Sequence, residues 1–225
     1  MAACLFASAW ARAEMPVAGP NVATAPTVLA TPAPPNPDQA PKAERRSGLV
    51  VGGTGLFAAG TADGYPNEAA KIGDPTYYGA GGAMAGGGGT GFVMGALADV
   101  LNFGLWFGYT LVQNNDWASE GIGGGFRLEA FPLYSIVPKL RDLGVFAQFG
   151  IGSANLTAEH GAYPGANGVQ SYISAGVFHE WTIFHMLGGH VTLAPSIELD
   201  YVTARSIERT TVGLGLRVAF YGGPK

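Results

Sequence analysis

The strongest constraint on the fold is a strict alternation of side-chain types over residues 210–221, which read TTVGLGLRVAFY. Successive side chains of a β-strand point to opposite faces, so a period of two predicts a strand with one apolar and one polar face. The apolar face carries Val212, Leu214, Leu216, Val218 and Phe220. The other face carries small or polar side chains, among them Arg217. Such a strand separates an apolar environment from a polar one.

The same alternation recurs from residue 48 onward. It predicts seven further strands, over residues 48–59, 91–98, 102–112, 121–131, 143–152, 170–181 and 191–201. Each is roughly ten residues long, the length that a tilted strand needs to cross a bilayer. An even number of antiparallel strands can close on itself, which removes the exposed edges that a bilayer does not tolerate. The predicted fold class is all-β, an eight-stranded antiparallel up-and-down transmembrane barrel over residues 48–225.

The segments between these strands alternate in length, as expected for long extracellular loops and short periplasmic turns. The longest, residues 60–88, is polar and then glycine-rich, and is expected to be a loop. Residues 153–168 are expected to form a second long loop. Residues 132–142 are long for a periplasmic turn, so a short helix is expected there.

Composition agrees with an outer surface that meets lipid. Of the 225 residues, 48% are hydrophobic and only 12% charged, against about 25% charged in soluble proteins. The 36 glycines show no collagen-like period. This composition also suits a low-complexity or amyloid-like chain, which the regular strand pattern disfavours. The net charge of −4 gives no basic surface, so no nucleic-acid partner is expected.

The N-terminal part is predicted to lie outside the barrel. Residues 1–13 resemble a signal peptide, with an apolar run and a small-x-small cleavage site, although no basic residue precedes the run and its true start stays open. A short buried segment is the alternative. Cys4 is the only cysteine, so no disulfide is expected. Residues 14–47 contain eight prolines and are expected to be a disordered linker, acting as a spacer, a tether or a partner ligand.

Gly215, Val218 and Phe220 resemble the C-terminal assembly signal of bacterial outer-membrane barrels, although GGPK follows Tyr221 where the strictest form ends on the aromatic. Together with the strand number, the alternation, the loop lengths and the signal peptide, they make the chain similar to the eight-stranded barrels of the OmpA/OmpX-like superfamily. The resemblance implies a monomer in the outer membrane of a Gram-negative envelope. Its expected partners are outer-membrane lipid and, through the last strand, the barrel-assembly machinery.

Charged residues on the polar faces of the strands are the candidate functional residues. They are Arg127, Glu129, Glu180, Glu198, Asp200 and Arg217. A charge inside a narrow barrel is costly unless it is paired, so they are expected to form an internal ion-pair network. We expect Glu198 to lie opposite residues 215–217 and to pair with Arg217, with Asp200 or Arg127 nearby. The network would either plug the lumen or form a gate for ions.

Two other sequence motifs, and the histidines, could indicate a more specific structure or function. Residues 86–91 match G-x-G-x-x-G, but no βαβ unit surrounds them, so no dinucleotide cofactor is expected. Residues 92–112 are long enough for a transmembrane helix, but Asp99 and Asn102 lie within them, so a β-hairpin is favoured.

The four histidines are His160, His179, His185 and His190. Outer-membrane lipid A deacylases carry a His-x-Ser pair on a strand, but none of the four histidines here is followed by serine at the second position. His185 and His190 flank a turn and are expected to meet water. No catalytic or metal site is expected.

The sequence thus predicts a non-enzymatic outer-membrane protein with a structural or surface-binding role, whose extracellular ligand stays open. A small gated channel is the first alternative. A lipid-modifying enzyme is the second, and would require Asp63, Glu68, Asp74 or Glu159 to converge with a histidine.

Overall fold

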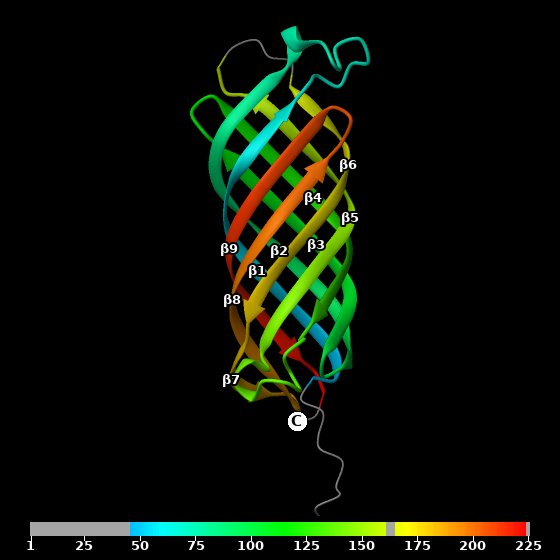
Figure 1. The fold of residues 1–225 in the computed structure, drawn as a ribbon, viewed down its shortest axis with the longest axis vertical. Helices are drawn as coiled ribbons and strands as arrows, with labels where there is room; N and C mark the ends of the chain where they lie inside the picture. The colour runs from blue at the N-terminus through cyan, green and yellow to red at the C-terminus, as the bar shows by residue number, and fades with distance from the viewer. Residues whose placement is uncertain (1–45, 161–164, 224–225) are drawn as a thin grey trace, which may run out of the picture. The chain divides into compact units, whose positions relative to one another are not determined.

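The computed structural model describes residues 46–160 and 165–223, which form one antiparallel β-sheet that closes into a barrel (Figure 1). Its strands are β1 (Gly48–Gly64), β2 (Gly79–Ala98), β3 (Leu101–Gln113), β4 (Trp117–Ala130), β5 (Leu143–Ala158), β6 (Ala166–His179), β7 (Trp181–Met186), β8 (Gly189–Thr203) and β9 (Ile207–Tyr221). Two 3-10 turns, η2 (Pro75–Tyr77) and η3 (Pro138–Leu140), lie between strands. Within these residues, no helix is long and apolar enough to cross a membrane.

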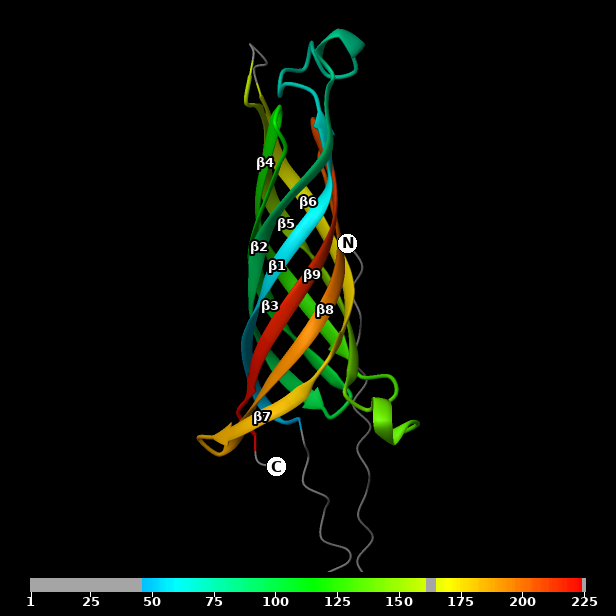
Figure 2. The same ribbon diagram turned by 90° about the vertical axis from the view of Figure 1, so that its left-hand side faces the viewer.

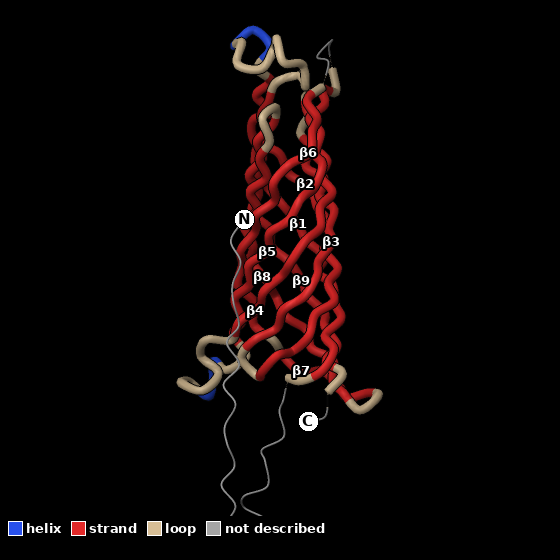
Figure 3. The backbone as a smooth tube through the Cα atoms, turned by 90° about the vertical axis from the view of Figure 1, so that its right-hand side faces the viewer, coloured by secondary structure: helices blue, strands red, loops and turns tan. Residues whose placement is uncertain are grey.

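The nine strands occupy eight positions around the ring. Only Glu180 separates β6 from β7, and both pair with β8. The ring closes because β1 pairs with β9 and β6 pairs with β8. The order around it is β1, β2, β3, β4, β5, β6 with β7, β8 and β9. The predicted eight-stranded antiparallel barrel is confirmed, and its strands are tilted against the barrel axis (Figure 3).

Side chains alternate between the outer and inner faces as predicted. Along β9, Leu214 and Leu216 are exposed, whereas Arg217 is fully buried. The structure also fixes the facing of the first two strands, because Val50 of β1 and Phe92 of β2 are buried in the interior. The outer face is apolar around the ring, with exposed Phe57, Leu105, Phe107, Ile122, Phe126, Phe149, Ile151, Ile173, Val177, Ile197, Leu199 and Val212.

The glycine-rich segment lies in β2, so the prediction of a loop over residues 60–88 was wrong. The connection is confined to residues 65–78. Gly88 pairs with Leu56 of β1 and with Thr110 of β3, and a Cβ atom on Gly88 would overlap the carbonyl oxygen of Tyr109. Backbone pairing needs no side chain, so a glycine-rich strand lacks the alternation that reveals other strands. The G-x-G-x-x-G match at residues 86–91 therefore lies within a strand.

The remaining strands are where the sequence placed them, and several are longer. β5 continues to Ala158 and β6 begins at Ala166, which shortens the second expected loop. Residues 92–112 form the favoured hairpin of β2 and β3. The expectations for the signal peptide and most of the linker fall on residues 1–45, outside the described residues.

The two ends of the barrel differ in their connections (Figure 2). The loop end carries residues 65–78, 114–116, 159–160, 165 and 204–206. The turn end carries residues 99–100, 131–142 and 187–188, together with residues 46 and 223. The connection 131–142 contains η3, as predicted.

Closure of the barrel predicts a simple electrophoretic behaviour. A closed ring of backbone pairs resists detergent until it is heated, so the purified protein should migrate differently before and after boiling. Its circular dichroism should be dominated by strand. Identical mobility of boiled and unboiled samples, with a helical spectrum, would contradict the closed barrel.

Candidate functional site, a charge cluster inside the barrel

The inner face of the barrel holds buried charges that balance one another. In the described part of the chain, eight charged side chains expose 2% or less of their surface: Arg46, Arg127, Glu129, Glu180, Glu198, Asp200, Arg209 and Arg217. Four are arginines and four are carboxylic acids, so their formal charges cancel. All six predicted interior charges are among them, and Arg46 and Arg209 are additional.

Arg217 of β9 forms the central contacts of the cluster. Its Nη2 donates to both carboxylate oxygens of Glu129 on β4, at 2.9 and 3.1 Å, and its Nη1 donates to Glu180 between β6 and β7. β4 and β9 are four positions apart in either direction around a ring of eight. The Arg217–Glu129 ion pair therefore spans the lumen from one wall to the opposite wall.

Neighbouring side chains complete the coordination of the two glutamates. Arg127 Nε donates to Glu129 Oε1 at 2.9 Å, and Asn102 Nδ2 donates to Glu129 Oε2 at 3.1 Å. Tyr221 donates its hydroxyl to Glu180 Oε1 at 2.6 Å. Charge-assisted bonds of this kind offset the cost of burying ions.

Aromatic rings enclose the two arginines. The Arg217 guanidinium lies 4.8 Å from the ring centre of Phe92 and 4.6 Å from that of Phe178. The Arg127 guanidinium lies 4.0 Å from the ring centre of Phe146. Cation–π contacts are stronger where water is excluded.

Each of these rings lies against a glycine on a neighbouring strand. The pairs are Phe92 with Gly52, Phe178 with Gly144 and Phe146 with Gly176. A Cβ atom on any of the three glycines would overlap the facing ring. The interior glycines therefore provide the space that lets large rings and arginines share a narrow lumen.

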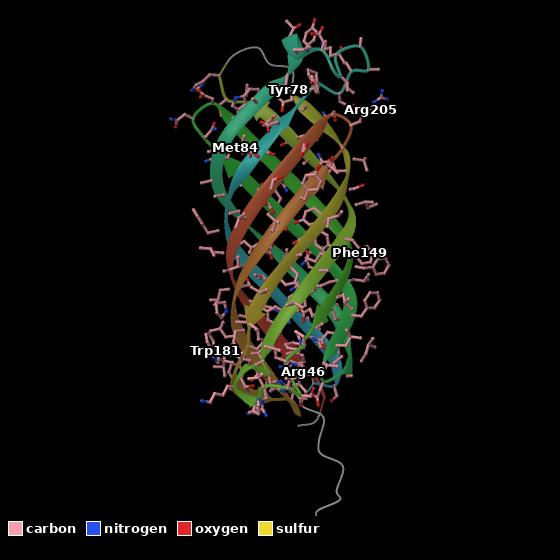
Figure 4. All side chains as sticks on the ribbon, viewed as in Figure 1. Arg46, Tyr78, Met84, Phe149, Trp181 and Arg205 are labelled. Carbon is pink, nitrogen blue, oxygen red and sulfur yellow. The ribbon has the colours of Figure 1, made fainter. Side chains whose placement is uncertain are left out.

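Arg46, which precedes β1, closes the cluster at the turn end (Figure 4). Its Nη2 lies 2.8 Å from Asp142 Oδ1 and 3.3 Å from Glu180 Oε2, and its Nη1 donates to the carbonyl of Asp99 at 3.1 Å. Its guanidinium also stacks at 3.6 Å on the ring of Phe131. This one side chain thus joins three separate segments of the turn end. Arg46, which the sequence assigned to the linker, therefore contacts the barrel.

Tyr134 supports the same end. Its hydroxyl donates to Asp99 Oδ2 at 2.9 Å. Burial, followed by this hydrogen bond to Asp99, raises the pKa of Tyr134. The hydroxyl therefore stays protonated and available as a donor at neutral pH.

Glu198 and Asp200 do not join the cluster. Glu198 lies opposite Gly213, while Arg217 lies opposite Ala194, so the predicted Glu198–Arg217 pair is wrong. The connection between β8 and β9 is only residues 204–206, which shifts the register from the one expected. Within the described residues, neither oxygen of Glu198 has a hydrogen-bond partner, and Asp200 accepts from Thr211 at 3.3 Å.

Two interior arginines were missed in the sequence for different reasons. Arg46 precedes the first strand and follows a proline-rich stretch, so no alternation marks it. Arg209 was assigned to a loop, but β9 begins at Ile207, and Arg209 Nη1 donates to the carbonyl of Thr110 at 3.4 Å. Extending the period of two upstream from Arg217 through Thr211 would have placed Arg209 inside.

The histidines do not come together in a catalytic arrangement among the described residues. His190 was expected to meet water, but it is buried and stacks on Tyr221 with ring centres 4.9 Å apart. His179 lies beside Trp181. The described residues also contain no group of three or more His, Cys, Asp or Glu side chains that could hold a metal ion.

The polarity of this barrel is inverted relative to a soluble protein. Its charges are buried in the lumen, and its outer face exposes large apolar side chains around the whole ring. Soluble monomers rarely expose apolar patches larger than a few hundred Å². Aromatic side chains flank the apolar zone, with exposed Trp181 and Phe184 near the turn end and Tyr109 and Tyr201 toward the loop end. The chain has the fold of an outer-membrane β-barrel.

Comparisons with known proteins return several similar solved structures, all of low sequence identity. No protein-family model and no curated protein sequence matches the chain. The attachment invasion locus protein Ail of Yersinia pestis, in complex with the heparin analogue sucrose octasulfate, aligns with 9% identity and a TM-score of 0.44, over 77% of this chain and 99% of Ail. Neisserial surface protein A aligns with 12% identity and a TM-score of 0.42, over 78% of this chain and 97% of that one. The N-terminal β-barrel domain of Pseudomonas aeruginosa OprF aligns with 11% identity and a TM-score of 0.34, over 74% of this chain and 98% of that domain.

Because its ion pair with Glu129 crosses the lumen, we expect Arg217→Ala to lower the stability of the barrel strongly. The change leaves the buried carboxylates of Glu129 and Glu180 without their central partner, so the free energy of unfolding should fall by about 3–5 kcal/mol, or less where water enters. Denaturant unfolding in detergent measures this. Arg205→Ala, at the exposed loop end, is the control and should change stability by less than about 0.5 kcal/mol. Equal stability of the two variants would show that the pair does not hold the barrel together.

Proposed function

We propose that this protein is a non-enzymatic outer-membrane barrel with a structural or surface-binding role, whose lumen is closed by the internal ion-pair cluster. The observation that carries the proposal is the Arg217–Glu129 ion pair between opposite walls, with aromatic rings packed against it. Eight strands leave an interior just wide enough for side chains to fill. A lumen crossed by a charge pair and filled by phenylalanine rings leaves little space for an ion path.

The candidate assembly signal has a geometry that suits recognition from outside. Val218 and Phe220 are on the outer face of β9, which pairs with β1 to close the ring. Both can therefore contact lipid or the assembly machinery while the strand is being inserted. We propose in addition that the protein is a monomer and that it binds an extracellular ligand, whose identity stays open.

A small gated channel is the second candidate, and Arg46 is the observation that favours it. Arg46 lies outside the strands of the wall, yet it fills the turn end and contacts Asp142 and Glu180. A plug attached by a single segment could leave the lumen without unfolding the barrel. A lipid-modifying enzyme has less support, because the imidazole of His190 is already engaged by Tyr221.

Electrical recording separates the closed barrel from the channel. In a planar bilayer the wild type should show little or no conductance, because Arg46 and the cluster behind it both block the lumen. Arg46→Ala alone should remain closed, whereas Arg46→Ala with Arg217→Ala should show open events. A large, stable wild-type conductance would refute the closed lumen, and opening by Arg46→Ala alone would establish the gated channel instead.

The assembly signal is tested in cells. Phe220→Ala should lower the amount of protein in the outer membrane, because recognition of the last strand would read this aromatic side chain. The purified, refolded variant should keep the heat-dependent mobility of the wild type, because Phe220 contributes to the outer face and not to the lumen. Wild-type levels in the membrane would show that the motif is coincidental. Leu214→Ala, on the same face, is the matched control.

A further inference from the structure

The outer wall of β3 to β6 is hollowed near the loop end. A groove of about 490 Å³ lies there, lined in part by Tyr109, Ile122, Ser153 and Val169. The strand register places these four side by side on the outer face. Ser153 has the shortest side chain of the four and lies between two exposed aliphatic residues. Its small size accounts for the hollow.

The loop-end side of this groove is polar. One step toward the loop end, the register aligns Glu120, Asn155 and Asn167, and Asn67 joins them from the connection 65–78. Asn155 Oδ1 accepts from the backbone N–H of Glu120 at 3.0 Å, and Asn167 Oδ1 accepts from Asn67 Nδ2 at 3.3 Å. The oxygens of both asparagines are thereby engaged, which leaves their N–H groups as donors beside the Glu120 carboxylate.

On the side away from the loop end, the first groove is followed by a second, apolar groove. A second groove, of about 470 Å³, lies further along the same strands β4, β5 and β6. The register aligns Gly124, Ile151 and Ser171 one step beyond Ile122, Ser153 and Val169, and then aligns Phe126, Phe149 and Ile173. Phe149 projects outward from the wall in Figure 4. Gly124 and Ser171 are short, so the hollow extends toward the middle of the barrel.

The two grooves are neighbours along the same strands, and together they form a track that is polar at the loop end and apolar toward the middle of the barrel. Among the described residues that line the two grooves there is no lysine or arginine, and Glu120 is the only acid. Amide donors beside a carboxylate acceptor match hydroxyl groups, which both donate and accept. A phosphate would meet the Glu120 carboxylate with no cation beside it, which is unfavourable.

We propose that this track binds one amphiphilic lipid with an uncharged, sugar-like head group. The head lies against Glu120, Asn155 and Asn167, and an acyl chain lies along Ser153, Gly124 and Ser171. This orientation places the head at the loop end, as for a lipid in the membrane leaflet on that side. The inference rests on the membrane location of the barrel.

Native mass spectrometry of the full-length protein in detergent tests the site. Three probes share the same two acyl chains: a diacylglycerol with a neutral disaccharide head, phosphatidylglycerol, and plain diacylglycerol. The wild type should bind one molecule of the disaccharide lipid. Half of the protein should be occupied at a lipid concentration about tenfold lower than for either of the other two probes. Equal retention of all three would overturn the head-group assignment.

Variants separate the chain groove from the head-group contacts. Ser153→Leu fills the hollow from an exposed position and should abolish retention of every probe, whereas Ala59→Leu, on the outer face of β1, should retain the disaccharide lipid like the wild type. Asn167→Ala should keep binding but lose the preference for the disaccharide head. Retention by Ser153→Leu would refute the site. Conductance of these variants should stay as in the wild type, so failure here is distinguishable from failure of the closed lumen.

Discussion

Burying charge in the narrow interior of an eight-stranded barrel is the constraint on which the rest of this structure depends. An unpaired ion there would cost several kcal/mol, and the interior holds four arginines and four acids whose charges cancel. Arg217 bonds to Glu129 across the full width of the ring. Because that bond joins opposite walls, it fixes the cross-section of the barrel as well as neutralising two charges.

The glycine content follows from the same constraint. Phe92, Phe146 and Phe178 can enclose the arginines only because the residues facing them are glycines. In β2, glycine allows close approach of the neighbouring backbones. A composition that could indicate low complexity is here a packing requirement. Arg46 then contacts Asp142 and Glu180 at the turn end, which connects the start of the barrel to its interior charges.

The sequence correctly predicted the features that follow from a period of two in side-chain polarity. It failed for residues where this period is absent. The inward facing of Arg127, Glu129 and Arg217 followed from alternation alone. Partner choice did not, because Glu198 and Arg217 lie on adjacent strands whose register depends on a connection of three residues, 204–206. The actual partner, Glu129, lies on the opposite wall, a relation that no local pattern encodes. Arg46 precedes any strand, so only the folded structure reveals it.

Hydrogen exchange of the arginine side chains, measured by NMR on the refolded barrel, tests the central claim most directly. If the cluster closes the lumen, the guanidinium N–H groups of Arg217 and Arg127 should exchange with water far more slowly than those of Arg205, which is exposed at the loop end. Exchange of all three at the same fast rate would mean that water reaches the cluster freely and that the lumen is open.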